Sequence, residues 1–315
     1  MRFGVGDGRG GAGLAPASGL APASGLPSVS VVIPCFDQGH YLSEAIESVL
    51  LQSVPAGEVF VIDDGSHDNS FEVAGRYQSV RRLRQSNRGV AAARNAGLMA
   101  SSCECVVFLD ADDRLLGHAL EVGASALATR PRVAFVAGMS RDIAGDGTVL
   151  AGERQPLVSQ GHYVRLLEDC FIWSGSSIAY RRSALESLRG FDESLTAGDD
   201  YDLYLRLARR FPVYCHDSVV TEYRRHGTNT TRDPALVLAS QLEVLRRQRP
   251  WLRDARERRA RRVGIRKTRE RHGRALAEQV ACELRGHSWQ RALHGAQTLA
   301  RRDPRSLTRV LASVA

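Results

Sequence analysis

Residues 29–37, VSVVIPCFD, have the pattern that decides the fold: an apolar run that ends at a proline and a polar turn. The pattern recurs twice along the chain, as VFVIDDGS at residues 59–66 and VVFLDADD at residues 106–113. A short apolar run bounded by turn residues is typical of a buried β-strand. We therefore predict three buried strands, each followed by a turn that carries carboxylates.

The segments between these runs have helical periodicity. Leu42, Ile46 and Val49 recur at the spacing that places apolar residues on one helix face. The other predicted elements are helices near residues 71–77, after Gly89 and over residues 115–129, and strands near residues 80–83 and 133–137. Strands that alternate with helices indicate βαβ units, so we predict an α/β fold with a Rossmann-like, mostly parallel sheet flanked by helices.

Six acidic residues follow the three buried strands. They are Asp37, Asp63, Asp64, Asp110, Asp112 and Asp113. Parallel strands end at the same edge of a sheet, where these like charges would repel one another. Oxygen ligands with a D-x-D spacing suit Mg²⁺ or Mn²⁺, so we expect a divalent cation among them. The alternative is that each acid caps the helix that follows it.

The chain divides into three predicted regions. Residues 1–27 contain a tandem LAPASG repeat without periodicity, which predicts a disordered leader. An α/β domain is expected over residues 28–232, and a basic helical extension over residues 233–315. In the extension, Leu238, Leu242 and Leu245 share one helix face before Pro250 breaks the run.

Positive charge is concentrated in residues 246–274. This segment carries fourteen Arg or Lys against three acids, an excess of +11 on a chain whose net charge is +8. Such a segment suits an anionic membrane surface, where lipid-linked acceptors would be found, or a solvated, self-paired helix face. Nucleic acid is a weaker alternative, because Trp251 is the only aromatic residue there for base stacking.

The chain has no run of about 18 apolar residues of the kind that spans a membrane. Its first residues also lack the apolar stretch of a secretory signal, so we expect a cytoplasmic location, with contact at the inner face of the membrane as an extension of it. The six cysteines include no C-x-x-C pair, and we expect them to be structural.

Four segments, in order and spacing, resemble family 2 glycosyltransferases. They are VSVVIPCFDQGHYLSEAIESVLLQS at residues 29–53, VFVIDDGSHDNS at 59–70, NRGVAAARNAG at 87–97 and FLDADD at 108–113. The resemblance extends over residues 28–226 and implies the GT-A fold. It also implies a metal-dependent, inverting enzyme of polysaccharide biosynthesis. The donor would be a nucleotide-diphosphate sugar, and the acceptor hydroxyl would belong to a glycan, a lipid-linked molecule or a small molecule.

The resemblance implies that the first strand-end loop and the DDGS turn bind the nucleotide. The residues at the matching positions are Pro34, Phe36, Asp37, Asp64 at the base edge, and Gly89, whose backbone approaches the nucleotide. Arg94 and Asn95 follow in the next helix. Two interpretations of this pair stay open, direct contact with the nucleotide or a buried polar anchor at the helix start.

The resemblance also implies a metal site for Mn²⁺ or Mg²⁺. Asp110 and Asp112 match the D-x-D pair, which contacts the ribose and ligates the metal through the diphosphate, and Asp113 is a further candidate. His226, in YRRHG at residues 223–227, matches a histidine that completes the metal shell or contacts the diphosphate. The cation would neutralise charge on the leaving diphosphate.

The segment GDDYD at residues 198–202 resembles the motif that holds the catalytic base. Asp200 matches the base, and Asp199 lies on the acceptor side at a position where glutamate is commoner. A helix start favours an anion, so we expect a low pKa for Asp200, with helix capping as the alternative role. Trp173 matches the acceptor-side wall, where it would stack on a sugar or fill the core; we favour the core.

Two other functions compete with this interpretation. The stretch LDAD at residues 109–112 resembles the signature of an aspartate-nucleophile phosphatase, which requires Thr or Val at position 114 and a downstream lysine. Position 114 is arginine, and the only lysine, Lys267, lies in the basic tail, so the phosphatase is excluded. The other alternative is a non-catalytic module that binds nucleotides or nucleic acid through the arginine-rich tail.

Overall fold

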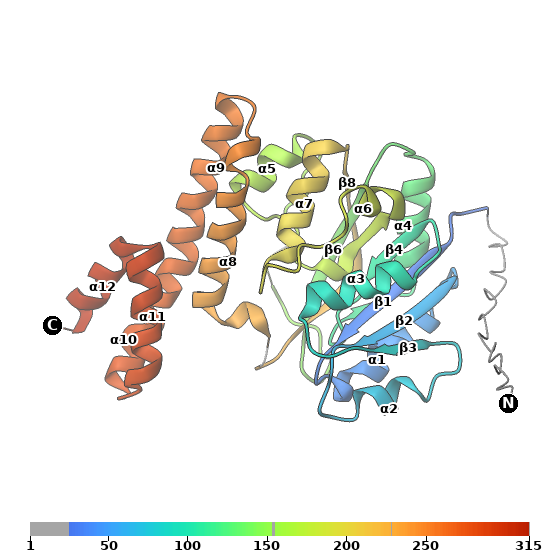
Figure 1. The fold of residues 1–315 in the computed structure, drawn as a ribbon, viewed down its shortest axis with the longest axis horizontal. Helices are drawn as coiled ribbons and strands as arrows, with labels where there is room; N and C mark the ends of the chain where they lie inside the picture. Colours follow the sequence, from blue (N-terminus) through green and yellow to red (C-terminus); the bar gives the residue numbers. More distant parts are fainter. Residues whose placement is uncertain (1–24, 153–154, 228, 315) are drawn as a thin grey trace, which may run out of the picture.

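A computed structural model describes residues 25–152, 155–227 and 229–314 of the chain, and its ribbon is shown in Figure 1. Within these ranges, eight strands form one mixed, mostly parallel sheet in the order β3-β2-β1-β4-β7-β6-β8-β5. They are β1 (Val29–Cys35), β2 (Glu58–Asp63), β3 (Arg81–Arg84), β4 (Cys105–Phe108), β5 (Arg114–Leu115), β6 (Phe135–Ala144), β7 (Ile178–Arg181) and β8 (Tyr214–Arg225). The predicted α/β fold is confirmed.

The first half of the sheet is parallel and contains the three strands predicted as buried. Strand β1 pairs with β2, with Ile33 opposite Val61, and with β4 on its other side, where Val31 lies opposite Val107. Strand β2 pairs in parallel with β3. The loops that follow β1, β2 and β4 therefore leave the sheet at the same edge.

The second half of the sheet contains antiparallel pairs. Strand β7 runs antiparallel to both β4 and β6, whereas β8 runs parallel to β6 and antiparallel to β5. Leu115, predicted as the start of a helix, instead pairs with Thr221 of β8, and its neighbour Arg114 pairs with Glu222. The predicted helix consequently begins only at Ala119, because pairing with a distant strand overrides local helix propensity.

Helices cover both faces of the sheet, as the alternation of side chains along β1 requires. Val31 and Ile33 pack against α1 and α4, whereas Val32 faces α3 and α7 on the other side. The helices of this part are α1 (Gly39–Leu50), α2 (Ser70–Ala74), α3 (Val90–Ala100), α4 (Ala119–Ala128), α5 (His162–Glu168), α6 (Arg182–Ser187) and α7 (Asp199–Arg210). The sheet is therefore the middle of three layers (Figure 1).

The predicted helical extension is present at the C-terminal end. Its helices are α8 (Pro234–Arg247), α9 (Ala255–Thr268), α10 (Arg274–Arg285), α11 (Trp289–Arg302) and α12 (Pro304–Val314). Helix α8 contributes Val244 and Leu245 to the core that covers one face of the sheet. Helices α10 to α12 share a separate core with the start of α8, and they project away from the sheet in Figure 1.

The remaining predictions concern the leader, the cysteines, membrane-spanning helices and the domain boundary. Of the predicted leader at residues 1–27, only residues 25–27 are described, so that prediction lies outside the described residues. All six cysteines are free, and Cys103 and Cys105 are buried beside β1. No helix in the described ranges is long and apolar enough to cross a membrane. The division at residue 232 remains a prediction.

The close packing of α3 on β1 leads to a testable prediction. Gly97 of α3 lies over Val32 of β1, and a methyl group added to Gly97 would collide with Cγ1 of Val32. Gly97→Ala should therefore lower the free energy of unfolding by about 1–3 kcal/mol through overpacking, despite a gain in helix propensity of about 1 kcal/mol. The measurement is the urea midpoint of unfolding.

Val32→Ala provides the matched control, because it empties the space that the new methyl group needs. The double variant should lose less free energy of unfolding than the two single variants lose together, as expected for residues in contact. Additive losses, or a Gly97→Ala protein as stable as wild type, would contradict the packing described here.

Candidate functional site

The site lies at the edge where β1, β2 and β4 end. The loop after β1 is joined to the loop after β2 through Asp37, whose carboxylate accepts hydrogen bonds from the backbone N–H groups of His67 at 2.6 Å and Asp68 at 3.3 Å. The hydrogen bond from His67 has the largest effect on the pKa of Asp37, and together these bonds hold that pKa below its usual value. Phe36 is 40% exposed and lies edge-on to the His67 ring. Asp37 thus fixes the loop that presents Phe36.

Asp64 holds the loop that leads into α3. Its buried carboxylate accepts hydrogen bonds from the backbone N–H groups of Arg88 at 2.9 Å and Gly89 at 2.8 Å, and from the side chain of Gln85. Gly89 has a φ of +89°, in the region that favours glycine, and the space beside its α-carbon is open. The carboxylate predicted at the nucleotide base edge therefore also shapes the loop around Gly89.

The six acids do not gather around one cation, which corrects the expectation of a single cluster. Asp37 and Asp64 bind backbone N–H groups, and Asp63 is paired with Arg84. Asp113 points into the protein, where burial raises its pKa, and it accepts hydrogen bonds from Ser176 Oγ at 2.8 Å and the Arg224 N–H at 3.0 Å. Among the described residues, no three acidic, histidine or cysteine side chains converge on one metal position.

Asp110 and Asp112, the two acids of the D-x-D pair, remain; Asp110 pairs with Arg94 and Asp112 meets His226. Asp112 Oδ2 lies 2.8 Å from His226 Nε2, and burial, followed by the neighbouring charge of Asp110, raises the pKa of Asp112. A carboxylate beside an imidazole offers oxygen and nitrogen donors that Mn²⁺ accepts. Cations of this class often bind through one or two carboxylates and take their remaining ligands from phosphates and water. The residues present therefore fit a divalent cation shared with a diphosphate.

Arg94 links the two sides of the site from within α3. Its Nη2 lies 2.7 Å from Asp110 Oδ1, its Nη1 lies 2.8 Å from Asp199 Oδ2, and its side chain is only 8% exposed. Asn95 exchanges hydrogen bonds with the backbone N–H and C=O of Phe191. Arg94 is buried and Asn95 is half-buried, and their contacts are those of a polar anchor. Direct contact with the nucleotide stays a prediction.

Asp199 and Asp200 begin helix α7, after Gly198 with a φ of +76°. Asp199 is buried against Arg94, so it faces the interior rather than an acceptor. Burial, and then the charge of Asp199, raises the pKa of Asp200 to about 6. The expected low pKa is therefore wrong, because desolvation and a like charge outweigh the helix dipole at this position.

Trp173 is 40% exposed, so the preference for a core position is wrong. It lies in the segment before the short turn Gly175–Ser177. In that turn, Ser176 Oγ binds Asp113 and accepts the Asp110 N–H at 3.1 Å. The sequence gives no local signal for the role of this turn in holding the D-x-D loop, because Ser176 and Asp110 lie 66 residues apart.

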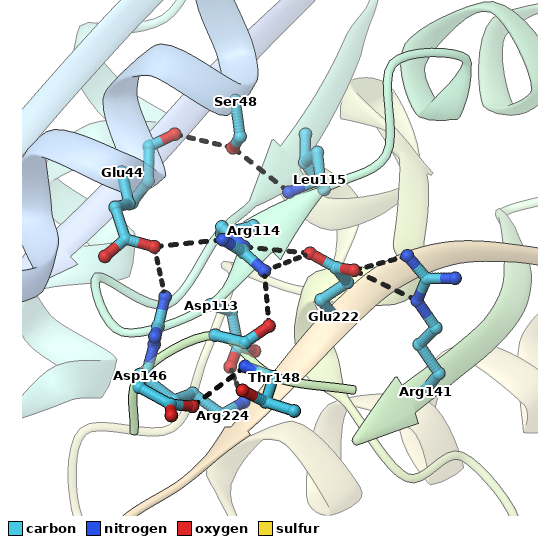
Figure 2. Close-up of polar contacts among 12 residues, drawn as sticks. Glu44, Ser48, Asp113, Arg114, Leu115, Arg141, Asp146, Thr148, Glu222 and Arg224 are labelled. Carbon is cyan, nitrogen blue, oxygen red and sulfur yellow. Dashed lines mark hydrogen bonds and ion pairs between the residues drawn. The ribbon is translucent and has the colours of Figure 1, made fainter. Parts of the chain in front are cut away.

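Arg224 is a further residue that sequence analysis missed. It is fully buried, donates from Nε to the Asp112 carbonyl at 2.8 Å and from Nη2 to Glu44 at 2.7 Å. Figure 2 shows how the chain of charges continues from Glu44 through Arg114 to Glu222. A buried arginine needs such partners, and here they tie α1 and the end of β8 to the loop that carries Asp112. The signal available in the sequence was the charged pair Arg224-Arg225 beside His226.

The chain resembles known proteins in both sequence and structure. The family model "Glycosyl transferase family 2" matches residues 30–189. An uncharacterized glycosyltransferase of Rickettsia felis is 28% identical over 210 residues, which cover 65% of this chain and 34% of the relative. One from a Nostoc species is 33% identical over 173 residues, 52% of this chain and 54% of the relative. A chondroitin synthase of Escherichia coli is 28% identical over 65% of this chain and 30% of its own length.

Solved structures agree on the fold. TarS residues 1–349 of S. aureus in complex with UDP superposes with a TM-score of 0.62 at 18% identity, covering 91% of this chain and 88% of that chain. The same protein in complex with UDP-GlcNAc gives a TM-score of 0.64 at 16% identity. The matches span between 30% and 54% of the length of the curated relatives described above. The family model covers just over half of the chain, with the strand-end loops of β1, β2 and β4 inside the match, and the chain therefore belongs to glycosyl transferase family 2.

Proposed function

We propose that this chain transfers a sugar from a nucleotide-diphosphate sugar to an acceptor hydroxyl, as part of polysaccharide biosynthesis. The observation that carries the proposal is the arrangement at one sheet edge of Asp112 against His226, and of Asp110 and Asp199 on the same arginine. Membership of the family supports it. The structural neighbour TarS, described in complex with UDP and with UDP-GlcNAc, makes a uridine nucleotide the first donor to test.

The nucleotide would lie across the loops that follow β1 and β2. Pro34 and Phe36 supply apolar surface, and Asp37 and Asp64 hold their loops through backbone N–H groups. Gly89 adds an open approach to the backbone, because no described residue other than its chain neighbours has an atom within 4 Å of the position of a β-carbon. Preformed loops of this kind reduce the ordering cost of binding.

Asp112 and His226 would hold the divalent cation, Mn²⁺ or Mg²⁺, and Asp110 would assist from its position on Arg94. When bound, the cation supplies charge neutralisation for the diphosphate that leaves. Arg224 positions the Asp112 backbone and Arg94 orients Asp110, so both carboxylates are fixed before the donor arrives. Prior positioning of charged groups is a large part of the catalytic effect in transfer reactions.

Asp200 would act as the general base. With a pKa of about 6 it is ionised near neutral pH, and it is more basic than an ordinary aspartate. Asp200 accepts the acceptor hydroxyl proton while the acceptor oxygen bonds to the anomeric carbon. The bond to the diphosphate breaks with its electron pair, in one displacement that inverts this carbon. Trp173, exposed beside the same edge, offers an aromatic face to an acceptor sugar.

The basic extension would rest on an anionic membrane from the cytoplasmic side. Lys267 and Arg271 pair with Asp169, but Arg256, Arg258, Arg259 and Arg262 are exposed and make no ion pair with any described residue. On α11, Trp289 and Leu293 are 60% and 59% exposed. Arginines together with exposed tryptophan and leucine are the composition of helices that lie at a bilayer surface.

Asp200→Asn tests the base. The amide cannot accept the acceptor proton, so transfer should fall by about 10²–10⁴-fold, whereas UDP affinity should stay within about threefold because Asp200 lies on the acceptor side. Asp202→Asn is the matched control, since Asp202 is on the same helix and pairs with Arg206. It should lose stability but keep most of its activity. Full activity of Asp200→Asn, or loss of its UDP binding, would refute the assignment.

A vesicle assay tests the membrane contact. Vesicles that contain phosphatidylglycerol should bind the full chain, and vesicles of phosphatidylcholine alone should not. Replacing Arg256, Arg258, Arg259 and Arg262 with glutamine should reduce binding at least tenfold, since each basic residue near an anionic surface contributes about 1 kcal/mol. Binding that persists at about 0.5 M salt, where surface charges are screened, would count against the proposal.

A further inference from the structure

One buried guanidinium, that of Arg94, bridges two segments that are distant in sequence. Asp110 follows β4 on the donor side, and Asp199 begins α7 next to Asp200. The two terminal nitrogens of Arg94 lie 2.7 Å from Asp110 and 2.8 Å from Asp199. Any displacement of one carboxylate therefore changes a contact of the guanidinium that also holds the other.

The guanidinium itself is fixed by α3. The next residue, Asn95, is bonded to both backbone groups of Phe191, and the Arg94 guanidinium lies 5.4 Å from the centre of the Phe191 ring. Nε of Arg94 is buried and has no hydrogen-bond partner among the described residues. Burying a charge with one donor unsatisfied is costly, so stability alone is a poor reason for an arginine at this position.

Arg94 is also the positive charge in the surroundings of Asp200. The charged or titratable groups that face Asp200 are Asp199, Arg94, Asp110, Tyr180, Tyr204 and Cys170. Two of them are carboxylates that repel the Asp200 anion, and among the described residues that face Asp200, Arg94 is the one cation that offsets them. The hydroxyl groups of Tyr180 and Tyr204 and the Cys170 thiol are uncharged near neutral pH, because burial raises the pKa of each group.

We propose that Arg94 is a positioning residue that couples the donor side of the site to its base, by holding Asp110 and Asp199 on one guanidinium. The inference rests on the proposed function in one respect, the role of Asp200 as the base. In this account Arg94 does not touch the nucleotide. It keeps Asp200 ionised and aligned through Asp199. When Asp110 binds the donor, the shared guanidinium conveys the change to Asp199 at the start of α7.

The test compares Arg94→Gln, which removes the charge, with Arg94→Lys, which keeps the charge but loses the two-pronged contact. The pKa of Asp200 is read from the carboxyl carbon resonance of protein labelled with ¹³C-aspartate, assigned by its absence in Asp200→Asn. The titration midpoint should rise by about one pH unit or more in Arg94→Gln, because an opposite charge has been removed, and should move less in Arg94→Lys. In both variants kcat should fall at least tenfold, more than KM for the donor changes.

Arg206→Gln is the matched control, because Arg206 pairs with Asp202 on the same helix and contacts neither Asp110 nor Asp199. It should lower the melting temperature without moving the Asp200 midpoint. An unchanged midpoint in folded Arg94→Gln would overturn the proposal, as would a loss confined to donor KM, which would make Arg94 a donor ligand. Absence of transfer by the wild-type chain would instead refute the proposed function, while the carboxyl titration, which needs no substrate, would still decide the role of Arg94.

Discussion

Repulsion among carboxylates at one sheet edge is the constraint on which the rest of this structure depends. Parallel pairing of β1 with β2 and β4 brings the acid-bearing loops together, and like charges in a partly buried site are costly unless they are compensated. The chain compensates them individually. Backbone N–H groups bind Asp37 and Asp64, and Arg84 pairs with Asp63.

The same compensation separates structural acids from those available for chemistry. Asp113 is committed to Ser176 and the Arg224 backbone, while its neighbour Asp112 meets His226. Arg94 then connects this region with Asp199. A site built in this way has its loops and charges in place before a ligand binds, which suits a reaction whose catalysis depends mainly on positioning.

Much of this arrangement could be predicted from the sequence, because it depends on local patterns. The strand at β1 and the turn around Asp110 each follow from a short run of apolar residues and the polar residues after it. The family resemblance then pointed to the residues near the site. It assigned Asp112 and His226 to the same metal site, and the structure brings these two side chains into contact.

Other features depend on contacts between distant segments, and no local pattern encodes them. Glu44 and Arg224 are 180 residues apart in sequence. The raised pKa of Asp200 arises from burial and from Asp199, against the helix dipole that a sequence argument emphasises. Pairing of Leu115 with β8 shortened the helix predicted over residues 115–129. The exposure of Trp173 has no local signal in the sequence.

The central claim is that the carboxyl edge of this sheet binds a nucleoside diphosphate through a metal held by Asp112. Calorimetric titration of UDP with and without Mn²⁺ tests this claim in wild type, Asp112→Ala and Glu104→Ala. Glu104 is the control because it is an exposed acid just before the first residue of β4, at the other edge of the sheet. Mn²⁺ should tighten UDP binding in wild type and Glu104→Ala but not in Asp112→Ala. Equal UDP affinity with and without the metal, or an unaffected Asp112→Ala, would contradict it.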